Sequence, residues 1–129
     1  MKQVIRTQGS HVPDAPYSQA IAFKDLLFTA GQCPKDLKTG KCIDGSIEEQ
    51  VRLVLENLKA VLEAGGSSLD NVLKTTVFLV DMNDFDIMNK IYKEYFKDNK
   101  PARSCIQAAK LPFDIKVEIE AIAYIPTGS

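Results

Sequence analysis

The sequence predicts an α+β fold in which a mixed sheet carries two helices on one of its faces, with the element order ββαβαββ. Three observations lead to this prediction. The segments 46–64 and 85–96 repeat apolar residues at helical spacing, and the segment 72–80 alternates like a strand. Turn formers also divide the segments 20–29 and 101–125 into pairs of strand-like runs.

The N-terminal part of the chain is expected to supply strands. Residues 2–7 resemble a short strand, and residues 8–16 form a loop that contains one glycine and two prolines. The apolar runs 20–23 and 26–29 flank a two-residue turn, which predicts a hairpin. Residues 31–45 are predicted to be a polar loop without regular structure.

The first helix has the clearest local signals. Ser46 with Glu49 three residues later forms a capping box, which predicts the start of the helix. Apolar residues recur at helical spacing as far as Leu62, and the pair Gly65-Gly66 predicts its end. Arg52 lies on the opposite, charged side at i,i+4 spacing, so we interpret it as a solvated ion-pair residue.

The second half of the chain continues the pattern. Residues 72–80 form a strand with apolar residues on both faces, residues 81–84 turn the chain, and a second helix runs to about Phe96. Pro101 marks the start of the last segment. Because turn formers separate its two strand-like runs, residues 101–125 are predicted to form a hairpin.

The predicted sheet has more apolar surface than two helices can cover. The strand 72–80 needs cover on both faces, and the last strand alternates apolar residues with the charged Lys116, Glu118 and Glu120. Two helices cover one face only, so the other face would meet water in a monomer. We therefore expect a homo-oligomer that packs sheet surfaces together.

Composition excludes several classes of protein. The chain has 129 residues, 45% of them apolar, and is expected to be one domain over residues 1–129. A net charge of −1 gives no general attraction to nucleic acid, and no apolar run approaches the ~20 residues of a membrane span. The N-terminus lacks a signal-peptide core, so we expect a cytoplasmic protein, with an organelle left open.

The cysteines and the histidine do not form a metal or disulfide pattern. The three cysteines, Cys33, Cys42 and Cys105, are odd in number and lack a CxxC spacing, while His11 is the one histidine. We interpret the cysteines as small buried residues in a reducing compartment, and expect no metal. Nucleotide-binding and hydrolase motifs such as GxGxxG, HExxH and GxSxG are absent.

Arg103 and Glu118 are the main candidates for chemistry. The predicted hairpin would bring them close together, where a guanidinium could hold a small anion and a carboxylate could move its protons. The alternative for Glu118 is a solvated strand charge. Asn89 is a poor helix former within a helix, Tyr17 follows a proline in a loop, and Gly31 allows close approach of a backbone, so these residues are further candidates.

Taken together, several segments resemble the RidA (YjgF) family of reactive-intermediate deaminases over almost the whole chain. The two motifs near the C-terminus, in this order and spacing, are the most specific. The matching segments are Pro16-Tyr-Ser-Gln19, Thr29-Ala-Gly-Gln32, Val72-Leu-Lys-Thr-Thr-Val-Phe78, Met82-Asn-Asp-Phe85, Met88-Asn89, Pro101-Ala-Arg-Ser-Cys105 and Val117-Glu-Ile-Glu-Ala121.

The resemblance implies a chorismate-mutase-like fold and a homotrimer with active sites between subunits. It also implies hydrolysis of enamines and imines, such as 2-aminoacrylate and 2-iminopropanoate, to 2-keto acids and ammonia without a cofactor. Arg103 would then clamp the substrate carboxylate, and Glu118 would position or deprotonate water. The backbone of Cys105 would contact the imine, while Tyr17, Asn89 and Gly31 would line the pocket, Tyr17 from the neighbouring subunit.

Two alternative functions to imine hydrolysis remain as hypotheses. Members of the family are described as endoribonucleases and translation inhibitors, which would make RNA a partner, although the net charge and the single histidine argue against it. The other alternative is a non-catalytic protein that acts as a chaperone or binds small carboxylates. The chain also has Ala30 where the family often has serine and Lys100 where it often has an aromatic residue, so rate and substrate preference stay undecided.

Overall fold

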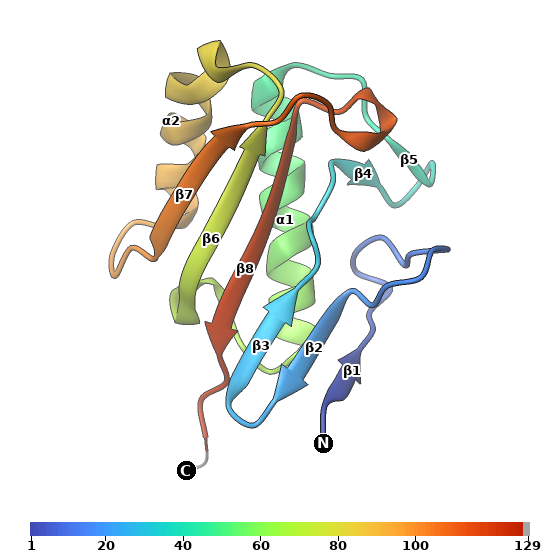
Figure 1. Cartoon of the computed structure of the whole chain (residues 1–129), viewed down its shortest axis with the longest axis vertical. Helices are drawn as coiled ribbons and strands as arrows, with labels where there is room; N and C mark the ends of the chain where they lie inside the picture. The colour runs from blue at the N-terminus through green and yellow to red at the C-terminus, as the bar shows by residue number, and fades with distance from the viewer. Residues whose placement is uncertain (128–129) are drawn as a thin grey trace.

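The computed structural model describes residues 1–127 and has a six-stranded mixed sheet with two helices packed on one face (Figure 1). The strand order is β1-β2-β3-β8-β6-β7, and a small two-stranded sheet, β4-β5, lies apart from it. The elements are β1 (Gln3–Ile5), β2 (Ala20–Phe23), β3 (Leu26–Thr29), β4 (Lys35–Asp36), β5 (Lys41–Cys42), α1 (Ile47–Ala64), β6 (Val72–Leu79), α2 (Phe85–Tyr95), β7 (Ala102–Gln107) and β8 (Val117–Tyr124).

The predicted C-terminal hairpin is wrong, because β7 and β8 are not neighbours. β7 is parallel to β6, to which α2 connects it, and β8 pairs antiparallel with the other edge of β6. Backbone hydrogen bonds from Ala108 to Leu79 (2.7 Å) and from Val80 to Lys116 (3.1 Å) hold the connecting segment against the end of β6. The chain therefore crosses over β6 instead of folding back on β7.

The first helix begins and ends where its sequence signals place it. The Ser46 hydroxyl accepts a hydrogen bond from the Glu49 backbone N–H at 3.1 Å, and the Glu49 carboxylate accepts one from the Ser46 N–H at 3.4 Å. The helix ends at Ala64, after which Gly66 takes a positive φ of 84° that favours glycine. The inner side of α1 packs on β8 and α2, and its fully buried residues include Val51, Val54, Leu55, Leu58, Val61 and Leu62.

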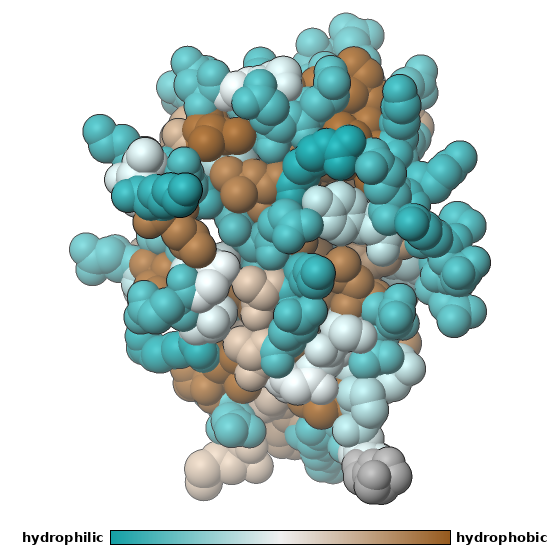
Figure 2. Space-filling view, turned by 180° about the vertical axis from the view of Figure 1, so that it is seen from behind, coloured by the Kyte–Doolittle hydropathy of each residue, from teal (hydrophilic) through white to brown (hydrophobic). Residues whose placement is uncertain are grey.

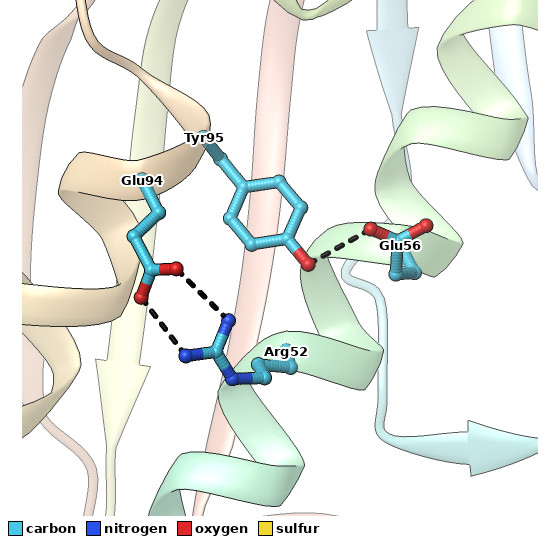
Figure 3. A network of polar contacts seen from close by, with 4 residues as sticks. All are labelled: Arg52, Glu56, Glu94 and Tyr95. Carbon is cyan, nitrogen blue, oxygen red and sulfur yellow. Dashed lines mark hydrogen bonds and ion pairs between the residues drawn. The ribbon is translucent and has the colours of Figure 1, made fainter.

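The second helix spans Phe85–Tyr95 and ends within one residue of its predicted end near Phe96. Figure 3 shows how its last turn is tied to α1: Arg52 donates two hydrogen bonds to Glu94, and the Tyr95 hydroxyl donates one to Glu56 at 2.8 Å. Arg52 is exposed and ion-paired, as predicted, but its partner lies on the other helix and not at i,i+4 in its own.

Both helices lie on the same side of the sheet, behind the strands in the view of Figure 1. The side chains of β8 that face the helices are almost fully buried, which confirms the predicted alternation of this strand. Within residues 1–127 no layer lies over the other face of the sheet. Its exposed apolar residues are Val4, Phe23, Leu26, Phe28, Ile106 and Tyr124.

Seen from the helix side, most of the surface is hydrophilic and the hydrophobic residues lie in separate spots between polar ones (Figure 2). None of the helices within residues 1–127 is both long and apolar enough to cross a bilayer.

The β4-β5 hairpin was not predicted. Each of its strands has two residues, which is too short for an alternating pattern to show. Gly40, with a φ of 73°, closes the turn by donating its N–H to the Asp36 carbonyl at 2.8 Å. This hairpin carries Lys35, which lines the same cavity as Glu118, as described below.

Candidate functional site

Glu118 lies on the open face of β8 beside the segment that follows β3. Gln32 and Ile119 exchange backbone hydrogen bonds of 2.8 and 3.3 Å, which bring residues 31–33 alongside Glu118. A Cβ atom on Gly31 would lie 2.7 Å from the Glu118 carboxyl carbon, so only glycine leaves room for this carboxylate without displacement. The Cys33 thiol approaches Glu118 Oε1 at 3.8 Å as a weak hydrogen-bond donor.

A cavity of about 540 Å³ opens beside Glu118. Tyr17 and Gly31, both predicted as site residues, line it together with Glu118. The Tyr17 side chain is half exposed at the cavity opening. The exposed ring of Phe113, a residue with a positive φ of 62°, lies at the same opening. The full lining is His11, Asp14, Ala15, Tyr17, Ala30, Gly31, Cys33, Lys35, Pro112, Phe113 and Glu118.

The surroundings of Glu118 make it a stronger base than a carboxylate in water. Burial raises its pKa, the hydrogen bond from Cys33 opposes that rise, and the nearby charge of Glu120 adds to it. Burial, with the charge of Glu118, raises the pKa of Cys33 to about 12. The thiol is therefore protonated near neutral pH, and acts as a donor to Glu118 and not as a nucleophile.

Arg103 lies in β7, where α2 packs against this edge of the sheet. Its Nη1 donates a hydrogen bond to Asn89 Oδ1 at 2.6 Å, and its guanidinium stacks 4.8 Å from the centre of the Tyr92 ring and 5.6 Å from that of Phe85. Within residues 1–127 the ion pair is Arg52 with Glu94, so Arg103 has no acidic partner there. A half-buried cation held by an amide and two rings is suited to bind an anion.

Cys105 lies two residues beyond Arg103 on the same side of β7. Its side chain packs against the core. Burial raises the pKa of the Cys105 thiol, and the charge of Arg103 offsets part of that rise. The structure thus brings three of the predicted site residues, Asn89, Arg103 and Cys105, to the border between β7 and α2.

Arg103 and Glu118 do not meet within one chain. Arg103 pairs in register with Thr75, which is buried under α2, whereas Glu118 pairs with Phe78, whose side chain lies on the open face. The expectation that they lie close together is therefore wrong for a single chain, because it depended on the hairpin. The predicted residues separate into a carboxylate half-site (Tyr17, Gly31, Glu118) and a cationic half-site (Asn89, Arg103, Cys105).

Sequence reasoning did not identify His11, Lys35 and Phe113, which line the cavity beside Glu118. The sequence predicts that His11 lies in the loop 8–16 and gives it no role, whereas in the structure its Nε2 lies 3.2 Å from Lys35 Nζ. An aromatic residue between Pro112 and Asp114, in a turn, was the one available signal for Phe113. No group of three or more His, Cys, Asp or Glu side chains within residues 1–127 could hold a metal ion.

A mixed sheet, a carboxylate in a cavity and an arginine without an acidic partner within residues 1–127 define a small α+β protein with groups that can hold a small anion. A family model described as Endoribonuclease L-PSP matches residues 8–125. The chain belongs to this family, which includes the RidA (YjgF) proteins that its motifs resemble.

Relatives in this family are similar over nearly their whole length. A RutC family protein of Pyrococcus horikoshii is 55% identical over 96% of this chain and 98% of its own. TdcF of Escherichia coli K12, provisionally named a reactive intermediate deaminase, is 44% identical over 95% of this chain and 97% of its own.

Solved structures confirm the predicted α+β fold. A Thermotoga maritima protein, described provisionally as an endoribonuclease, has a TM-score of 0.94 at 46% identity and covers 99% of this chain and 100% of its own. Escherichia coli TdcF with bound serine has a TM-score of 0.90 at 41% identity, over 96% of this chain and 99% of its own.

Proposed function

We propose that the protein hydrolyses 2-enamino and 2-imino acids, of the 2-aminoacrylate and 2-iminopropanoate type, to 2-keto acids and ammonia. The observation that carries this proposal is Arg103, a half-buried guanidinium without an acidic partner within residues 1–127. TdcF, which is provisionally named a reactive intermediate deaminase and whose structure contains serine, supports a substrate with the size and carboxylate of an amino acid.

The proposed active site forms between two copies in a homotrimer. The two half-sites lie on opposite faces of the sheet, so a ligand that contacts both must lie between chains. The exposed apolar residues of the open face give such an assembly a reason to form, because their burial removes apolar surface from water. One chain would supply Arg103, Asn89 and the backbone of Cys105, and its neighbour would supply Tyr17, Gly31 and Glu118.

In this site the residues divide the work of hydrolysis. Arg103 holds the carboxylate of the substrate by paired hydrogen bonds, and Asn89 keeps the guanidinium in place. Glu118 accepts a proton from water while the water oxygen bonds to C2 of the imine. Glu118 passes this proton to the nitrogen to give an amino alcohol at C2. As the C–N bond breaks, the hydroxyl proton also moves to the nitrogen, so ammonia leaves, C2 becomes a keto group, and imino acid and water give keto acid and ammonia.

The direct test adds the protein to a threonine dehydratase reaction and follows release of ammonia or 2-ketobutyrate. We expect acceleration by the wild type and at least a hundredfold loss in Arg103→Ala and Glu118→Gln, since each removes a group that contacts the reacting molecule. No acceleration by the wild type, or full activity in Arg103→Ala, would reject the proposal. Binding of 2-ketobutyrate without turnover would favour the carboxylate-binding module instead.

A shallow groove along α2 favours RNA binding as a second candidate. Four lysines, Lys90, Lys93, Lys97 and Lys100, line it with Glu94, which is already paired with Arg52. Such a stripe attracts polyanions. Salt-dependent binding of single-stranded RNA that is lost in a Lys93→Glu, Lys97→Glu double variant would support this candidate, and binding unchanged by these substitutions would reject it.

A further inference from the structure

The cavity beside Glu118 contains a cation, Lys35, that the proposed hydrolysis does not use. Lys35, in β4, lines this cavity with its ammonium 3.2 Å from His11 Nε2 and 5.6 Å from the centre of the Phe113 ring. It lies beyond 4.0 Å from every carboxylate of residues 1–127, because the salt bridge within that range is Arg52 with Glu94. Lys35 is thus a partly buried ammonium whose charge no neighbouring acid neutralises.

His11 and Phe113 hold this ammonium in place. Burial and the positive charge of Lys35 lower the pKa of His11, so near neutral pH its imidazole is uncharged. A neutral ring can accept a hydrogen bond at Nε2, and the ammonium is the donor beside it. The Phe113 ring contributes a cation–π contact, which orients the charge without neutralising it.

The other charged groups that line the cavity do not neutralise the Lys35 ammonium. Asp14 is exposed at the rim, where solvent screens its charge, and Glu118 lies beyond 4.0 Å from the Lys35 ammonium. The primary carboxylate of the substrate is assigned to Arg103 of the neighbouring chain. A cavity of about 540 Å³ has room for a longer molecule than a three-carbon imine, so an additional group of the substrate can extend toward Lys35.

We propose that Lys35, positioned by His11 and Phe113, forms a subsite for a second acid group of the substrate. On this basis the enzyme prefers 2-imino dicarboxylates, such as those formed by oxidation of acidic amino acids, to uncharged imines of equal size. The inference rests on the proposed hydrolysis and adds a substrate class to it.

The test compares substrates that differ in one charge. An amino acid oxidase generates the imines of glutamate and of glutamine in place, and semicarbazide traps whatever the protein leaves unhydrolysed. We expect the wild type to favour the glutamate imine, and Lys35→Met to lower kcat/KM for it by about tenfold, as for loss of a charged hydrogen bond, with little effect on the glutamine imine.

Matched variants separate a specific role from a structural one. Lys38→Met removes an exposed lysine of the same small hairpin and should leave both substrates unchanged. Lys35→Arg should retain the preference for the charged substrate. In His11→Ala we expect a higher KM for the glutamate imine at unchanged kcat, because His11 orients Lys35 and does not touch the reacting atoms.

Each outcome decides a different question. An equal loss for both imines in Lys35→Met would overturn the subsite, since Lys35 would then serve the common carboxylate or the fold. If neither imine is hydrolysed by the wild type, the proposed function fails, and the subsite is tested by binding alone. Tighter binding of 2-ketoglutarate than of 2-ketopentanoate, lost in Lys35→Met, would support it, and equal binding would reject it.

Discussion

Two small neighbours, Gly31 and Cys33, influence the position and the pKa of the Glu118 carboxylate. Gly31 leaves the space that the carboxylate occupies, and Cys33 supplies a weak hydrogen bond to a group that burial would otherwise push further toward its protonated form. The sequence identified Gly31 and Glu118 separately, through a glycine after a strand and a charge in an alternating strand. Their contact could not be predicted, because it depends on the bridge between Gln32 and Ile119.

We predict that Gly31→Ala lowers activity far more than stability. The new Cβ would overlap the Glu118 carboxylate, which can swing away from the cavity because it is the end of a flexible side chain. Imine hydrolysis and thermal unfolding measure the two effects. As a control, Gly31→Ala added to Glu118→Ala should cause no further loss of activity, and an additive loss would show that Gly31 acts by another route.

A second prediction concerns the pH dependence of hydrolysis. The hydrogen bond from Cys33 lowers the pKa of Glu118, so its removal in Cys33→Ala raises that pKa. If the ionised carboxylate is the base, the acidic limb of the kcat/KM profile moves to higher pH in this variant. Cys42→Ala, which removes a thiol without such a bond, should leave the limb in place; a shift to lower pH in Cys33→Ala would contradict the assignment.

Among the secondary-structure elements, the sequence predicted the helices more accurately than the pairing of the strands. The capping box at Ser46 and the glycines after Ala64 are short-range features, and both lie where predicted. The pairing of β8 depends on distant segments. The strand-helix-strand unit β6-α2-β7 favours a parallel pairing of β7 with β6. A strand as deeply buried as β8 also needs a neighbour on each side. The predicted hairpin of β7 and β8 was based on the turn residues alone.

The same capping box gives a prediction for stability. Ser46→Ala removes the acceptor of the Glu49 N–H at the start of α1 and should lower the free energy of unfolding by about 1 kcal/mol. Urea denaturation at neutral pH measures the change. Ser46→Asp restores an acceptor and should recover most of the loss, whereas equal destabilisation by both variants would mean that the cap contributes little.

For the whole molecule, the separation of Arg103 from Glu118 is the feature that governs the proposed function. The sequence predicted an uncovered sheet face and therefore an oligomer, and the apolar residues on the open face are consistent with that expectation. It could not show that the two main residues lie on opposite faces, because this follows from the register of β7 and β8 against β6.

Mixed oligomers test this arrangement. Arg103→Ala and Glu118→Ala chains, each with only residual activity alone, should regain activity when unfolded and refolded together, because some sites then combine an intact cation with an intact carboxylate. At equal amounts and random mixing, roughly a quarter of the sites do so. Refolding each variant alone is the control. Absence of recovered activity in mixed oligomers of confirmed composition would place both residues in the same chain's site.

The opposite placement of cation and carboxylate also bears on inheritance. In the proposed assembly each polypeptide would contribute to two reaction centres, one through Arg103 and another through Glu118. A cell that carries two different defective alleles, one damaged at each group, would then retain part of the proposed imine hydrolysis, whereas two copies of the same defect would leave almost none. Rescue between alleles is thus a trait that this topology would confer.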